Sequence, residues 1–122
     1  MRPHEKLDVW GRAVDFVTVI YRTTDGFPKE EKFGLTSQIR RAAVSIPANI
    51  AEGAARESPK EFAHFLSNAQ GSASELATEL LIAFRLGFLT EKDYSTLNPE
   101  LDNISRMIYG LSQHVKNKAH RQ

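Results

Sequence analysis

Two groups of side chains have the types and the spacing that chemistry would need. Glu61-Phe62-Ala63-His64 matches the Glu-x-x-His element with which helices of di-iron bundle proteins hold their metals. Glu75 and Glu79 are one helical turn apart, a spacing that suits a general acid and base pair. The first group is a candidate metal site and the second a candidate site of proton transfer.

The Glu-x-x-His element does not make a metal site by itself. A di-iron bundle needs a second copy of it, but the residues three positions before His114 and His120 are Leu111 and Asn117. His64 also falls off the apolar stripe of its segment, so we expect it to point outward. The sequence contains no cysteine, which excludes thiolate ligands and cysteine nucleophiles. We therefore predict no metal site and no cofactor.

The pair formed by Glu75 and Glu79 lacks the companions that catalysis requires. Neither a nucleophile motif nor a glycine-rich phosphate loop accompanies it. We expect these carboxylates to face solvent or to pair with arginines, with Glu75 in a structural polar role. The sequence therefore predicts that the protein is not an enzyme.

Six basic residues form the best candidate for a phosphate-binding set. Residues 29–60 carry six Lys or Arg against four acids, whereas residues 61–102 carry two against seven. Arginine offers the same two-pronged geometry to phosphate and to carboxylate. Two interpretations therefore stay open, nucleic-acid binding and pairing of the arginines with Glu75 or Glu79 of the same or a neighbouring subunit. The six residues are Lys29, Lys32, Arg40, Arg41, Arg56 and Lys60.

Four helical segments must position these side chains, since no alternation typical of strands is present. Short connections between long neighbouring helices favour antiparallel packing. We therefore predict an all-α, up-down-up-down four-helix bundle that forms a single domain over residues 1–122, with a frayed polar tail at 117–122. The helices are expected at about residues 7–23, 36–55, 59–86 and 91–116.

Several boundaries carry specific signals. Ser58-Pro59-Lys60-Glu61 combines an N-cap serine, a first-turn proline and a glutamate three residues after the cap. Thr90 is the expected cap of the fourth helix, in which Asn98-Pro99 predicts either a restarted helix or a kink. Pro47 lies inside the second helix, where we expect a kink without a break. In the first helix the expected core side carries Trp10, Ala13, Val14, Val17, Ile20 and Tyr21.

The second segment is apolar on two opposite faces. The stripe from Leu35 to Gly53 is the expected core face. The far side carries small apolar residues where a helix that contacts only its own core would carry charge, although alanine also reflects helix propensity. We predict that this far side is an oligomer interface, and that the polar Asn49 and Glu52 have structural roles, with Asn49 fixing register or capping a kinked backbone. The interface residues are Val44, Ala48, Ala51 and Ala55.

Composition narrows the class of protein further. The formal net charge is +1, which does not by itself indicate a nucleic-acid-binding protein. No apolar run approaches the roughly 20 residues that cross a bilayer, and the first residues lack the apolar segment of a signal peptide. We therefore expect a cytoplasmic protein without a membrane partner.

The chain resembles a bacterial four-helix bundle family whose members include proteins encoded in intervening sequences of large-subunit ribosomal RNA genes. The resemblance implies an antiparallel bundle that assembles as a pentameric ring. The family is similar in fold to the accessory variability protein of diversity-generating retroelements, which implies association with nucleic acid and with a nucleic-acid enzyme. The matching elements are Leu7-Asp8-Val9-Trp10, Phe27-Pro28-Lys29-Glu30-Glu31, Leu35-Thr36-Ser37-Gln38-Ile39-Arg40-Arg41-Ala42-Ala43, Ser45-Ile46-Pro47-Ala48-Asn49-Ile50-Ala51-Glu52-Gly53 and Gly71-Ser72-Ala73-Ser74-Glu75-Leu76.

Two functions follow from the residues and the resemblance together. The leading expectation is a non-enzymatic oligomeric protein that associates with RNA or DNA through its basic surface residues. The alternative is a structural or protein-interaction bundle that does not bind nucleic acid. Because function depends on sites and not on folds, the arrangement of the basic residues has to decide between them.

Overall fold

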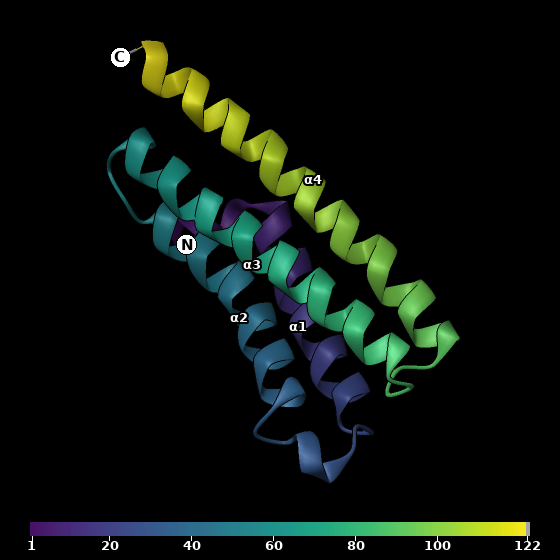
Figure 1. Cartoon of the computed structure of the whole chain (residues 1–122). Helices are drawn as coiled ribbons and strands as arrows, with labels where there is room; N and C mark the ends of the chain where they lie inside the picture. Colours follow the sequence, from purple (N-terminus) through teal and green to yellow (C-terminus); the bar gives the residue numbers. More distant parts are fainter. Residues whose placement is uncertain (122) are drawn as a thin grey trace.

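The computed structural model describes residues 1–121 and consists of helices and their connections (Figure 1). Two short 3-10 helices, η1 and η2, precede the first and second α-helices, and the part of the chain so described contains no strand. The all-α prediction with four α-helices is confirmed. The elements are η1 Pro3–Lys6, α1 Asp8–Thr24, η2 Lys29–Glu31, α2 Leu35–Ala54, α3 Pro59–Arg85 and α4 Glu91–Arg121.

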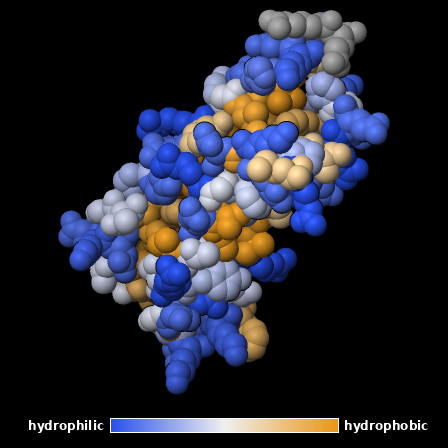
Figure 2. Space-filling model, turned by 180° about the vertical axis from the view of Figure 1, so that it is seen from behind, coloured by the Kyte–Doolittle hydropathy of each residue, from blue (hydrophilic) through white to orange (hydrophobic). Residues whose placement is uncertain are grey.

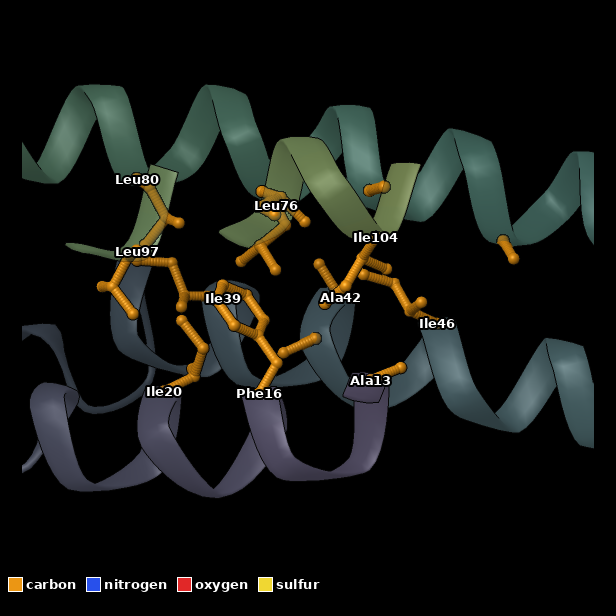
Figure 3. Packing of buried hydrophobic residues seen from close by; sticks show 14 of the residues in the cluster. Ala13, Phe16, Ile20, Ile39, Ala42, Ile46, Leu76, Leu80, Leu97 and Ile104 are labelled. Atoms are coloured by element: carbon orange, nitrogen blue, oxygen red, sulfur yellow. The ribbon is translucent and has the colours of Figure 1, made fainter. Parts of the chain in front are cut away.

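The core lies where the four α-helices face one another (Figure 3). α2 packs most extensively against α3, α3 packs against α4, and α1 packs mainly against α2. Ser45 of α2 contacts Ser72 of α3, and Gly53 lies beside Phe65, so these two helices run in opposite directions. The fully buried large residues come from every helix: Ile20, Ile39, Ile46, Ile50, Leu66, Leu76, Leu80, Leu101, Ile104 and Ile108.

The predicted helix ends are confirmed at three places. The Ser58 hydroxyl accepts a hydrogen bond from the Glu61 backbone N–H at 3.3 Å, as an N-cap does. The Thr90 hydroxyl accepts one from the Asp93 N–H at 3.1 Å. Gly87, two residues beyond the end of α3, has φ +79°, a left-handed conformation that favours glycine.

Both internal prolines lie within continuous helices. α2 runs through Pro47, as expected. Of the two alternatives predicted at Asn98-Pro99, the restarted helix is wrong, because α4 is continuous from Glu91. Pro99 is exposed while Leu97 and Leu101 are buried, so the proline ring lies on the solvent side and the apolar stripe continues past it.

Two further expectations need correction. The tail from residue 117 is helical as far as Arg121, because α4 continues past the buried Val115 without a terminator. Tyr21 was expected in the core but is exposed. The buried residues of α1 lie on a side of the helix that is rotated from the predicted core side. Trp10, Val14 and Val17 are half-buried at the edge of this buried side. The buried side consists of Val9, Ala13, Phe16, Ile20 and Thr24.

Hydrophobic surface is also visible on the outside of the bundle, between polar side chains on the face seen in Figure 2. Large apolar side chains are exposed on several elements, and Val44 on α2 is one of them. Apolar surface of this kind is typical of contact regions when it is contiguous. Within residues 1–121 no helix is both long and apolar enough to span a membrane.

Candidate functional site

The structure separates the six predicted phosphate-binding residues into three groups. Lys29, Lys32 and Arg40 line one shallow pocket near the start of α2. Arg41 lines a neighbouring groove, whereas Arg56 and Lys60 border a pocket beyond the other end of α2. A helix of 20 residues is about 30 Å long. The six residues therefore do not form one continuous site within a single chain.

The pocket near the start of α2, called here the basic pocket, has a volume of about 360 Å³. The short helix η2 carries Lys29 and leads into Lys32, and the Glu31 carboxylate caps α2 by accepting the Leu35 N–H at 3.2 Å. Thr36 is only 7% exposed, and its hydroxyl oxygen has no hydrogen-bond partner within residues 1–121. The lining residues are Thr24, Asp25, Phe27, Pro28, Lys29, Lys32, Thr36 and Arg40.

Arg40 is fixed by the last turn of α1. Its Nε donates to the Thr24 hydroxyl at 2.9 Å, and its Nη2 donates to the Tyr21 carbonyl at 3.2 Å and to the Asp25 carboxylate at 3.3 Å. The guanidinium also lies 4.5 Å from the centre of the Tyr21 ring. A cation at this place is favoured by the carbonyl groups that end a helix. Within its own chain Arg40 therefore pairs with Asp25 and not with Glu75 or Glu79.

Arg56 is likewise held within the chain. Its Nη2 lies 3.1 Å from the Glu52 carboxylate, one turn earlier in the chain. Its guanidinium lies 4.9 Å from the centre of the Phe65 ring. Glu52 therefore acts as a partner of Arg56, and the nearby Lys60 is exposed without a salt bridge among the described residues.

Arg41 occupies a different environment, which we call the α2–α3 groove. This groove has a volume of about 610 Å³ and carries Glu75 on its α3 side. Arg41 is exposed, and no carboxylate of residues 1–121 lies within 4.0 Å of it. The groove is lined by Tyr21, Gln38, Arg40, Arg41, Ala42, Val44, Ser45 and Glu75.

The predicted interface residues lie on the outer side of α2, where Val44 borders the α2–α3 groove. Val44 is 42% exposed. Ala48 and Ala55 are exposed, and Ala51 is half-buried. Because the core stripe of α2 is buried on the opposite side, this second apolar side has no partner within the described chain. The oligomer interface stays a prediction, and its residues are accessible to a second copy of the chain.

Glu79 differs from its sequence-based prediction. It is only 5% exposed, and its Oε1 has no hydrogen-bond partner in the described part of the chain. Burial raises the pKa of Glu79 to about 7, with smaller contributions from the Glu75 charge and from a side-chain hydrogen bond between the two carboxyl groups. The expectation that it faces solvent is wrong, and no arginine of the described part of its own chain pairs with it, whereas Glu75 is exposed. Its position three residues after the buried Leu76 is the sequence signal for its burial.

Asn49 joins a polar contact between α2 and α3. Its Nδ2 donates to the Ser45 carbonyl at 2.8 Å and to the Ser45 hydroxyl at 2.9 Å. The Ser72 hydroxyl of α3 lies 2.9 Å from the same Ser45 hydroxyl. Asn49 therefore bonds to the helix backbone beside Pro47, and the sequence does not indicate that Ser45 links it to Ser72 of α3.

His64 is exposed, as predicted, and its ring contacts Phe65 with the centroids 5.5 Å apart. Within the described residues no group of three or more His, Cys, Asp or Glu side chains is placed to hold a metal ion.

Residues 5–110 match the model of the 23S rRNA-intervening sequence protein family. The chain belongs to this family. The resemblance on the sequence motifs is thereby confirmed. The basic pocket, the α2–α3 groove and Glu79 all fall inside the matched span, so the candidate sites lie within the region that defines the family.

A crystal structure supports the same fold. A protein of unknown function from the S23 ribosomal protein family of Bacteroides thetaiotaomicron superposes with a TM-score of 0.77 over 85% of this chain and 97% of that chain. The two sequences are 24% identical, so the likeness extends to the fold alone. No curated protein matches this member of the 23S rRNA-intervening sequence protein family.

Proposed function

We propose that this protein is a non-enzymatic up-down-up-down bundle that assembles into a ring, a pentamer by resemblance, and binds nucleic-acid phosphates through the basic pocket. The observation that carries the proposal is the convergence of Lys29, Lys32 and Arg40 on one pocket that also holds the unpartnered hydroxyl of Thr36. Cations together with a hydroxyl donor are the groups that contact phosphate oxygens in nucleic-acid complexes. The ligand is therefore the phosphate backbone of RNA or DNA.

Each basic residue of the pocket has a distinct part. Arg40 is held in place by Thr24 and Tyr21, and Asp25 offsets some of its charge. Lys29 and Lys32 are exposed and form no salt bridge among residues 1–121, so their charges are available to a polyanion. Contacts to phosphate carry no sequence information directly, so the binding is largely independent of sequence.

Assembly strengthens this binding. One pocket provides too few charges for useful affinity, but linked copies of the pocket raise the effective concentration of each further contact. A ring of subunits repeats the pocket at regular intervals. The self-association through Val44 and its neighbours and the binding of nucleic acid are therefore two parts of one function.

The test measures binding to a fluorescent single-stranded RNA by anisotropy between about 50 and 200 mM salt. Affinity should fall steeply as salt rises, because each neutralised phosphate releases counterions. Replacing both Lys29 and Lys32 by alanine should flatten the slope of log K against log salt by about 1.4 for each occupied pocket.

A charge-matched control separates the pocket from net charge. The double variant Lys116→Ala with Lys118→Ala removes the same charge from exposed positions near the end of α4. It should leave the salt slope nearly unchanged. An equal change of slope in both double variants, or no binding by the wild type at low salt, would overturn the proposal.

A structural or protein-interaction bundle is the second candidate. It is favoured by the capture of Arg40 by Asp25 and of Arg56 by Glu52, which leaves fewer free cations than the sequence suggests. It is also favoured by the exposed apolar side of α2. An assembled protein that does not bind RNA or DNA at low salt would establish this alternative.

A further inference from the structure

Glu79 is buried without the compensation that a charged group needs. It is the sole acid or base among the buried residues of the described chain. An ionised carboxylate in such a place is unfavourable unless a cation or hydrogen-bond donors balance it. The group next to it is the carboxyl of Glu75, which has the same sign, and Oε1 of Glu79 has no partner. A single copy of the chain therefore leaves this acid pair without a cation.

The same surface carries a basic residue, Arg41, that has no acidic partner among the described residues. Arg41 lines the α2–α3 groove together with Glu75, yet no carboxylate of residues 1–121 lies within 4.0 Å of its guanidinium. The adjacent Arg40 differs from Arg41 because it already has a carboxylate partner, Asp25, and is also held by Thr24 and Tyr21. Each copy thus presents one free guanidinium and one acid pair on the same side of α2 and α3.

We propose that the α2–α3 groove is a socket in which Glu75, with the buried Glu79 one turn further along α3 beside it, receives the Arg41 guanidinium of a second copy of this chain. In a ring, each copy gives its Arg41 to one neighbour and receives the Arg41 of the other neighbour at its own acid pair. Arginine fits because its planar donors match a carboxylate in a two-pronged geometry. This inference rests on the self-assembly in the proposed function, and it names the contact that directs the assembly.

The apolar surroundings make the contact specific. Val44, which is exposed, and Ala42 line the groove beside Arg41. When a second copy covers them, water is excluded from the ion pair and its electrostatic attraction increases. A phosphate group is a poor occupant of this socket, because Glu75 and Glu79 would repel it. The basic pocket and the socket therefore bind different partners.

Assembly through this socket should depend on pH. The ionisable groups around the groove are Tyr21 of α1, Arg40 and Arg41 of α2, and Glu75 beside Glu79 on α3. In the isolated chain Glu79 keeps its proton up to a pKa of about 7, and an incoming guanidinium favours release of that proton. Assembly should therefore strengthen by up to tenfold per unit as the pH rises from about 6 towards neutrality. Glu79→Gln should remove this dependence.

The decisive experiment exchanges the charges between two chains. Arg41→Glu and Glu75→Lys are both substitutions of exposed residues, so both variants should fold and retain helical circular dichroism. Each variant alone should dissociate at a concentration at least tenfold higher than the wild type, because its socket meets a like charge. A one-to-one mixture should recover most of the assembly, since Arg41 of the Glu75→Lys chain meets the unchanged acid pair of the Arg41→Glu chain wherever the two chains alternate, and a ring of five keeps one mismatched junction. Light-scattering mass measures all three samples.

The possible outcomes separate the socket from the proposed function. Recovery in the mixture supports the contact between copies. If assembly is recovered only when both substitutions are in the same chain, Arg41 and Glu75 interact within one subunit, and the inference is overturned. Full assembly of each single variant also overturns it, while the apolar interface around Val44 and the RNA test are unaffected. If the wild type is monomeric at all concentrations, both the contact at the socket and the self-assembly in the proposed function are excluded.

Discussion

Gly53 of α2 lies so close to Phe65 of α3 that a Cβ atom at position 53 would come within 2.7 Å of the Phe65 Cβ. The same atom would be 2.9 Å from Cδ1 of Phe62 and 3.3 Å from its carbonyl oxygen. The Phe65 Cβ and the Phe62 carbonyl are fixed to the backbone and cannot turn aside. The absence of a side chain at Gly53 therefore allows the two helices to approach at this point.

Gly53→Ala should lower the free energy of unfolding by about 1–3 kcal/mol, because α2 and α3 must move apart to admit one methyl group. Urea denaturation followed by circular dichroism measures the loss. Gly110→Ala is the matched control, since nothing lies within 4 Å of a Cβ at that helical position. It should be neutral or stabilise by up to about 1 kcal/mol. Equal effects of the two substitutions would contradict the close-approach argument.

Arg40→Ala should destabilise the fold by about 1–3 kcal/mol, because it leaves the Tyr21 carbonyl and the Thr24 hydroxyl without this charged donor. Thermal or urea unfolding checks the result. Arg106→Ala removes an exposed pair with Asp102 one turn away and should change stability by less than about 0.5 kcal/mol. A neutral Arg40→Ala would show that Arg40 is not a structural link between α1 and α2.

Val44→Glu should dissociate the assembly while the helical circular dichroism is retained. The reason is that the new carboxylate would have to be buried against apolar surface of the neighbouring subunit. Tyr109→Glu is the control, as it places the same charge on an exposed aromatic position of α4. The mass of each variant is measured by light scattering. An unchanged mass for Val44→Glu would exclude this side of α2 from the interface.

In the dissociated protein, stability should fall as the pH rises from about 5 to 7. The folded-state pKa of Glu79, about 7, lies above the ordinary value of 4.5, so over this window the folded chain keeps a proton that the unfolded chain has lost. The contribution is fully present below the unfolded pKa and is lost as the pH passes the folded pKa, for a total of about 3 kcal/mol. Glu79→Gln should give a flatter profile. Parallel profiles for the two proteins would show that Glu79 does not cause the dependence.

Structural features that depend only on neighbouring residues can be predicted from the sequence. The start of α3 follows from Ser58 and Pro59, since capping depends only on neighbouring residues. The buried stripe of α2 follows from helical periodicity, and Ile39, Ile46 and Ile50 are all buried. These features need no knowledge of how the helices are placed in space.

The remaining features depend on tertiary placement. Arg40 is captured by Asp25 because the end of α1 lies beside α2, and periodicity within either helix does not reveal this. Glu79 is buried because α3 packs so broadly that the covered side extends beyond its leucine stripe. α4 continues through Pro99 because Leu97 and Leu101, on either side of it, are buried against the other helices, and this packing depends on the tertiary structure. The basic residues could be named from the sequence, but their separation into distinct groups could not.

The contacts between α2 and α3 also limit how the length of this chain can vary. Ser45 meets Ser72 at one point and Gly53 meets Phe65 at another, so the two helices are aligned twice along their axes. Inserting one residue between positions 45 and 53 would rotate everything beyond it by about 100° and would move Gly53 away from Phe65. Insertions and deletions should therefore be excluded from this stretch, whereas the connection at residues 55–58, which lies outside both helices, can accept them.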